Sequence, residues 1–149
     1  IVLSATIPQI QKLKDRGILT QTTNALTDLH KELLSVSEAA GNVRVFYFQI
    51  NKGGLEINPV SNTIMYSLEN TNLKYSELGK TITYSDITYL TEPHGSLYTI
   101  SLTLDYSSLF DITYQNGNDI KVFHNGIYKL RIENLGSQNG KLQIDFDVL

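Results

Sequence analysis

The stretch from Gly41 to Leu68, GNVRVFYFQINKGGLEINPVSNTIMYSL, decides the fold. Its first part, VRVFYFQI (Val43–Ile50), is apolar on both faces of an extended chain, which is typical of a strand covered on two sides. The turn residues Asn51–Gly54 then lead into Leu55–Ile57, and a second turn leads into Thr63–Tyr66. We therefore expect a central strand followed by a meander of shorter strands.

Before this stretch the pattern is helical. Leu19, Leu26 and Leu33 recur every seven residues, and Leu29 and Val36 fill the same stripe. These five residues are the candidate interaction surface. The stripe lasts only about three heptads, so docking on the following sheet is favoured over a free coiled coil.

Two glycines are expected to bound this helix. Gly41 is typical of the left-handed residue that follows a helix C-terminus. Gly17 would interrupt the helix earlier, with Thr20 or Thr22 capping a second segment. We therefore divide the chain into a helical segment, residues 1–41, and a β domain, residues 42–149, packed together as one unit.

The remainder of the chain repeats a period of two. In the last two segments Leu130, Ile132, Ile144 and Phe146 alternate with polar residues, and Gly136–Gly140 supplies the turn between them. About nine short strands, separated by turn signals every eight to twelve residues, predict an antiparallel β-sandwich. The predicted class is mainly β (α+β), with an N-terminal amphipathic helix.

Composition excludes several functions. The chain has 149 residues and a net charge of −3, which disfavours nucleic acid as a partner. It has no cysteine, which excludes disulfides and cysteine-rich zinc sites. No Asn-x-Ser/Thr acceptor occurs, so Asn-linked sugar is not expected.

Residues with catalytic potential are scattered. His30, His94 and His124 lack ligand spacing and are expected to be solvated. The turn Asn116–Asp119 leaves a calcium ion open as an alternative, although it lacks the spacing of a dedicated calcium loop. Asp145 and Asp147 are expected on the solvent face of a strand, beside other aspartates that could pair as glycosidase carboxylates. We predict a non-enzymatic protein with no catalytic residue, cofactor or metal.

Nine tyrosines without a tryptophan are the one compositional oddity. Tyrosine presents a flat ring and a hydroxyl, which suits interaction surfaces and sugar stacking. Tyr66, Tyr75, Tyr84 and Tyr89 are candidates for a cluster on one face. A carbohydrate-binding or other ligand-binding β-sandwich is therefore the alternative function.

The start of the chain carries no charge before Lys12. Ile1–Pro8 is too short to span a bilayer, which needs about 20 apolar residues. It is either an ordinary helix start or the outer end of a membrane helix, with Lys12, Lys14 and Arg16 at the polar boundary.

The apolar start, the basic boundary, the striped helix and the segment KGGLEINPVSNTIMY (Lys52–Tyr66) together resemble archaeal type IV pilin and archaellin-like surface proteins. The resemblance implies an N-terminal hydrophobic helix that carries a β-rich domain outside the membrane. It also implies protein partners at the cell surface or in a filament, self-association, and a membrane segment upstream of Ile1. Because glycan acceptors are missing, an accessory subunit fits better than a bulk filament protein.

Overall fold

The computed structural model describes residues 2–149, with side chains described from Ile7 onward. Helix α1 (Val2–Val36) is followed by ten strands in the described chain. They are β1 (Val43–Ile50), β2 (Gly54–Asn58), β3 (Thr63–Thr71), β4 (Thr81–Tyr84), β5 (Ile87–His94), β6 (Leu97–Asp105), β7 (Asp111–Tyr114), β8 (Lys121–Phe123), β9 (Gly126–Gln138) and β10 (Lys141–Val148).

Helix α1 is continuous through Gly17, so the predicted interruption is wrong. Asp15 and Leu19, on either side of Gly17, are both buried and hold that turn in place. The helix ends at Val36 and not next to Gly41. Gly41 does adopt the predicted left-handed conformation, with φ +86°, in the turn that leads into β1.

The strands form two sheets, which confirms the mainly β class. One sheet has the order β1-β9-β10-β7, and the other has the order β4-β5-β6-β3-β2-β8. The expected all-antiparallel arrangement is wrong at one pair, because β7 runs parallel to β10. The connection between these two strands contains β8 and β9 and is therefore long enough for a parallel crossover.

The prediction for β1 is right in its bounds and wrong in its place. β1 is the end strand of the four-stranded sheet and pairs only with β9. Phe48 and Ile50 are buried, whereas Val43, Val45 and Tyr47 are 37%, 45% and 63% exposed. The strand is therefore covered on one face only, by α1 and the six-stranded sheet.

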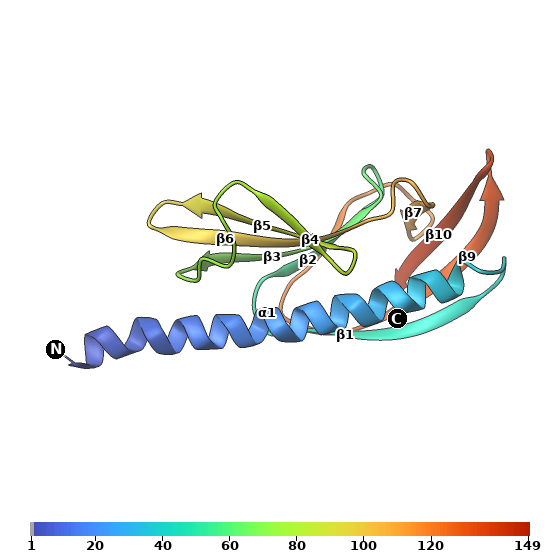
Figure 1. Ribbon diagram of the computed structural model, residues 1–149. Coiled ribbons are helices and arrows are strands. Elements are labelled where there is room, and N and C mark those ends of the chain that lie inside the picture. The colour runs from blue at the N-terminus through green and yellow to red at the C-terminus, as the bar shows by residue number, and fades with distance from the viewer. Residues whose placement is uncertain (1) are drawn as a thin grey trace.

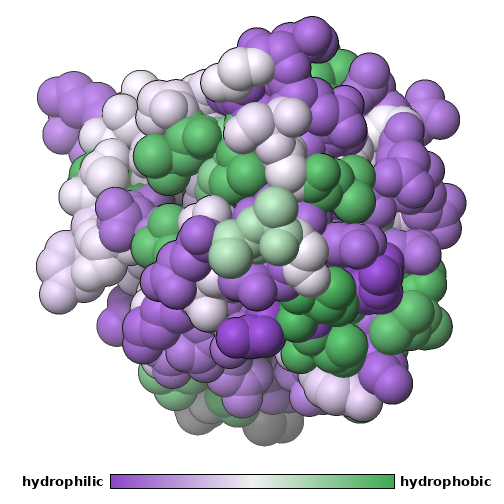
Figure 2. All heavy atoms as spheres, turned by 90° about the vertical axis from the view of Figure 1, so that its right-hand side faces the viewer, coloured by the Kyte–Doolittle hydropathy of each residue, from purple (hydrophilic) through white to green (hydrophobic). Residues whose placement is uncertain are grey.

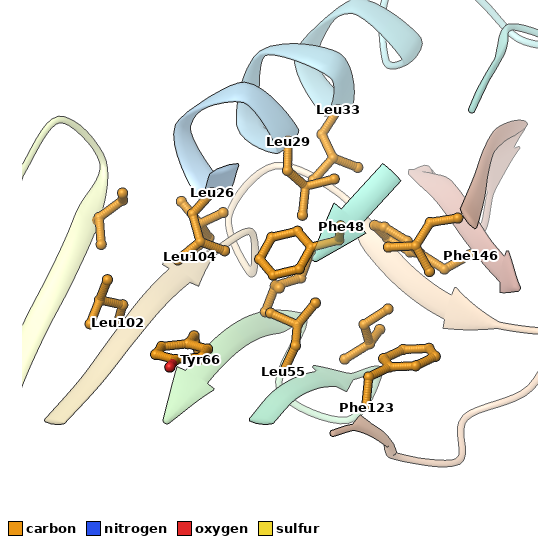
Figure 3. Close-up of a cluster of buried hydrophobic side chains, with 14 of the residues drawn as sticks. Leu26, Leu29, Leu33, Phe48, Leu55, Tyr66, Leu102, Leu104, Phe123 and Phe146 are labelled. Carbon is orange, nitrogen blue, oxygen red and sulfur yellow. The ribbon is translucent and has the colours of Figure 1, made fainter. Parts of the chain in front are cut away.

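The core lies where α1 meets both sheets. In Figure 1, α1 runs along the base of the molecule, and its N-terminal end projects beyond the strands. Figure 3 shows Leu26, Leu29 and Leu33 of α1 directed toward side chains of both sheets. Those partners are Phe48, Leu55, Tyr66, Leu102, Leu104, Phe123 and Phe146, each at most 3% exposed. The helix thus forms part of the same core as the strands.

The hairpin β9–β10 confirms the clearest strand prediction. Leu130, Ile132, Ile144 and Phe146 are fully buried. The turn between the strands uses Asn139 and Gly140, with φ +55° and +80°. Two successive left-handed residues match the twist of a tight hairpin, which explains why Gly is needed there.

Candidate functional site

The predicted interaction stripe of α1 is internal. Leu19 is 1% exposed, and Leu26, Leu29, Leu33 and Val36 are 0% exposed. All five belong to the hydrophobic core of the β domain. The stripe therefore binds the sheets of its own chain and offers no surface to another molecule.

A buried carboxylate fastens the first half of α1 to the strands. Asp15 is 0% exposed. Its Oδ2 accepts a hydrogen bond from the Thr71 hydroxyl at 2.6 Å, and its Oδ1 lies 3.0 Å from Lys52 Nζ and 3.2 Å from Gln11 Nε2. Thr71 and Lys52 come from the β-rich part of the chain, so this cluster joins segments far apart in sequence.

The position of Asp15 in the sequence contains a signal for this contact. Asp15 lies in the basic run Lys12–Arg16, which was interpreted only as a polar boundary. It also lies four residues before Leu19, which places both side chains on one face of the helix. A carboxylate in line with a buried stripe needs a partner, and Lys52 is that partner.

Tyr66 lies beside this cluster in the core. Its hydroxyl donates to the carbonyl oxygen of Lys52. The pKa of Tyr66 is raised from 10.0 to about 12, mainly by burial; a hydrogen bond with Thr22 opposes this rise and the Asp15 carboxylate adds to it. The neutral phenol is therefore the form that the folded protein requires.

This environment predicts a loss of stability in alkali. A phenol with a raised pKa in the folded protein contributes stability that is fully present below pH 10 and is lost as the pH rises through about 12. Thermal unfolding followed between these pH values should show a falling melting temperature. Tyr66→Phe should make that fall shallower, and an unchanged slope would contradict the assignment.

The first half of α1 also exposes apolar residues. Ile7, Ile10 and Leu13 are 65%, 47% and 69% exposed. Leu13 is two residues from Asp15, which places it about 200° around the helix from the buried carboxylate. We call these three residues the outer helix face. Ile1 and the side chains of residues 2–6, where the rest of the predicted apolar start falls, lie outside the described part of the structure.

Within residues 2–149, no helix combines the length and the apolar character that crossing a bilayer requires. Gly17 follows the outer helix face along α1. A methyl group added at Gly17 would meet no atom within 4 Å. The region around the outer helix face is therefore open.

Three of the four tyrosines predicted to cluster do meet. Tyr75, Tyr84 and Tyr89 line one pocket of 280 Å³ together with Ser76 and Ile82. The rings of Tyr75 and Tyr89 lie 5.5 Å apart between centroids, and Tyr84 is 73% exposed. Tyr66 is not part of the pocket, because it fills the core at 1% exposure.

His30 is not the solvated side chain that was expected. Its Nδ1 is hydrogen-bonded to the Tyr106 hydroxyl at 2.8 Å, its ring stacks on that of Tyr106, and its Nε2 lies 3.5 Å from Asp86. Burial raises the pKa of Tyr106, and the Asp86 carboxylate adds to the effect. The other two histidines, His94 and His124, are exposed, as predicted.

Asp145 is also misplaced by the sequence pattern. It is 4% exposed and accepts hydrogen bonds from the Thr113 hydroxyl at 2.6 Å and from the Asn116 backbone N–H at 2.8 Å. The turn that follows β7 folds over this carboxylate because β7 lies beside β10. Asn116, in the turn considered for calcium, is therefore engaged with Asp145. Among residues 2–149, no three His, Asp or Glu side chains gather as metal ligands would.

Comparisons with known proteins give no relative: no family model, no curated protein and no solved structure matches the chain. Function must therefore be inferred from two features, the outer helix face and the tyrosine pocket. The first is an apolar surface without a covering element, and the second is a small cavity with exposed rings.

Proposed function

We propose that the chain is a non-enzymatic structural and interaction subunit at the cell surface, comparable with the extracytoplasmic part of the pilin-like proteins that it resembles. One observation carries the proposal: α1 extends past its docked part and exposes Ile7, Ile10 and Leu13. Exposed apolar residues on a rigid element are suited to contact with another protein. The accessory role, in preference to bulk filament protein, follows from the missing glycan acceptors.

Helix α1 would then serve two purposes. Its later part is the spine of the β domain, through the buried stripe from Leu19 to Val36. Its first part would contact neighbouring subunits and continue toward a membrane segment upstream of Ile1. Because α1 is unbroken at Gly17 and fastened at Asp15, force applied to one part is passed to the other.

The β domain would present its loops outward. We infer that the two sheets act as an antiparallel sandwich around the end of α1, with the parallel β7–β10 pair as an exception. A carrier of this kind has no need of a reaction centre. We expect the purified protein to hydrolyse no glycoside, ester or peptide substrate at an enzyme-like rate. Hydrolytic activity that co-purifies with the protein would contradict the non-enzymatic role.

The proposal is tested by placing charge on the outer helix face. Ile10→Lys with Leu13→Lys should move the full gene product out of the sheared filaments of its own cells, while a membrane segment upstream of Ile1 would keep it in the membrane fraction. Lysine is a good helix former, so the fold should be kept, and an unchanged melting temperature checks this. The readout is the share of the protein in the filament pellet and in the membrane fraction after shearing and centrifugation.

A matched control adds the same charge elsewhere on α1. Gln21→Lys with Asn24→Lys also changes two exposed residues, but on the part of the helix that already carries polar side chains. This variant should fractionate like the unchanged protein. Equal pelleting of both double variants, or a wholly soluble unchanged protein, would contradict the proposal.

The tyrosine pocket favours a second candidate, carbohydrate binding. Its lining residues, Tyr75, Ser76, Ile82, Tyr84 and Tyr89, carry no formal charge, and they offer aromatic rings together with hydroxyl groups. Such a site suits a neutral, hydroxylated ligand that stacks on a ring. The volume of 280 Å³ limits it to about one or two sugar rings.

This candidate predicts that Tyr84→Ala weakens glycan binding at least tenfold, which corresponds to about 1.4 kcal/mol. Tyr47→Ala is the matched control, because Tyr47 is 63% exposed and lies on the other sheet. Titration calorimetry with a panel of neutral oligosaccharides is the measurement. An unchanged affinity in Tyr84→Ala, or the absence of binding to every member of the panel, would contradict it.

A further inference from the structure

We propose that the free edge of β1 pairs with β1 of a second copy of this chain. The two strands would run antiparallel about a two-fold axis at Val45 and join two four-stranded sheets into one. This inference goes beyond the function proposed above and does not depend on the outer helix face.

The exposed part of β1 is apolar. Val43, Val45 and Tyr47, which we call the outer β1 strip, face solvent together with Ile127 of β9, which is 70% exposed. On the inner face of the same half-strand, Arg44 is exposed and Phe46 is only partly buried. The first half of β1 is therefore open on both faces.

The free edge lacks the usual protection against pairing. In the described chain no strand pairs with that edge. β1 has no proline, and its register with β9 runs without a bulge from Val43–Glu133 to Ile50–Gly126. Natural edge strands are normally shortened, bulged or charged so that they do not pair with other molecules. The edges of the six-stranded sheet follow this rule, since β4 and β8 have four and three residues.

Charge guards only one group of this edge. The only charged residue of β1 is Arg44, which lies 3.6 Å from Glu32 of α1 and donates from Nη1 to the Val43 carbonyl oxygen at 3.1 Å. On the outer face the charges belong to β9, where Glu133, Arg131 and Lys129 lie opposite Val43, Val45 and Tyr47. Arg131 is paired with Glu133 at 2.9 Å, and Lys129 lies over the Tyr47 ring at 5.9 Å. Figure 2 views the molecule from the side of β9 and β10 and shows hydrophobic residues scattered among hydrophilic ones.

A second copy is the occupant because β1 is complementary to itself. With the axis at Val45, Val45 faces its own equivalent, and Val43 faces Tyr47 of the other copy. Pairs of aromatic and β-branched residues across antiparallel strands are favourable. Arg44 then faces Phe46 of the other copy, so no like charges lie directly opposite each other. Such an isologous contact also satisfies the closed symmetry of most dimers.

The expected affinity is modest. A standard interface buries about 800 Å² on each partner, and the outer β1 strip with Ile127 supplies only part of that area. We therefore expect dissociation constants of about 10–500 µM, which correspond to about 5–7 kcal/mol. Sedimentation equilibrium over this concentration range is the suitable measurement.

The test is made on the chain of residues 1–149. Val45→Lys should weaken dimerisation at least tenfold, and Val45→Thr, which keeps the β-branched shape, should weaken it less. Tyr84→Lys is the control, because it adds the same charge to an exposed position on β4, an edge of the other sheet. Melting temperatures confirm that each variant is folded.

A second readout checks the register. The chain has no cysteine, so any disulfide-linked dimer must come from an introduced one. Val45→Cys should cross-link to itself, because its two copies face each other within disulfide distance. Gln49→Cys, which is exposed on the same strand but away from the axis, should not cross-link.

Dimerisation that Val45→Lys weakens and Tyr84→Lys leaves unchanged, with cross-linking at Val45→Cys alone, supports the proposal. A monomer throughout the concentration range overturns it. Dimers that survive Val45→Lys, or that Ile10→Lys with Leu13→Lys removes instead, also overturn it and assign self-association to the outer helix face. Equal cross-linking at both cysteine positions overturns the register.

Discussion

Leu29→Ala is expected to lower the free energy of unfolding by about 2–5 kcal/mol. Leu29 is 0% exposed and points from the middle of α1 toward Phe48 and its neighbours in both sheets. Its truncation leaves a cavity where three structural elements meet, and none of them can move in without loosening the other two. Urea unfolding followed by circular dichroism gives the free energy directly.

The matched control is Leu34→Ala in the same helix. Leu34 is 41% exposed, so the same change in side chain should cost far less, within about 1 kcal/mol. Similar losses in the two variants would mean that α1 does not dock on the sheets as described.

Asp15→Ala is expected to lower the free energy of unfolding by about 2–3 kcal/mol. The change removes the acceptor for the Thr71 hydroxyl and the partner of Lys52. The side chain of Lys52 is 35% exposed and can still be hydrated in the variant. The loss of unfolding free energy is therefore smaller than for an ion pair in which both partners are buried. Urea unfolding gives the total loss.

Hydrogen exchange should show where the loss acts. The amides of α1 before Leu19 should exchange faster in Asp15→Ala, whereas those after Leu26 should change little. Asp28→Ala is the control, because the Asp28 side chain is 65% exposed and lies 4.0 Å from Lys31. Uniformly faster exchange along the whole of α1 would argue against a local fastening role for Asp15.

Local pattern was sufficient for some features of this fold and insufficient for others. The bounds of β1 could be predicted because a run of mostly apolar, aromatic and β-branched residues lies between two turns. Its position at the end of a sheet could not be predicted, because it depends on β9, a strand far along the chain that pairs Gly126 with Ile50 and Glu133 with Val43. One face of β1 is therefore exposed, although its composition suits burial on both faces.

The buried carboxylates show the same limit. Asp145 looks like an ordinary surface charge in the sequence, and the spacing of Asp15 from Leu19 indicates its face of the helix but not its partners. Each is buried by a threonine distant along the chain, Thr71 for Asp15 and Thr113 for Asp145. Only the pairing of strands brings such partners together, so residue type and spacing could not reveal them.

The candidate sites divide in a similar way. The helical stripe was predicted residue by residue, but its partner is the core of the same chain. Of the four tyrosines predicted to cluster, three do so. Tyr84 and Tyr89 lie on adjacent strands, and Tyr75 lies on the loop before them. The outer helix face was missed, since Ile10 and Leu13 are interrupted by Lys12 in the sequence.

The position of β10 between β9 and β7 has a consequence for how the protein is made. During synthesis β1 emerges well before β9, so β1 has no strand to pair with until β9 follows, and β9 is completed only by β10. Contacts of such long sequence separation slow folding, and apolar surface stays uncovered meanwhile. The four-stranded sheet should therefore stay unformed, with apolar surface of α1 and β1 uncovered, until β10 has left the ribosome.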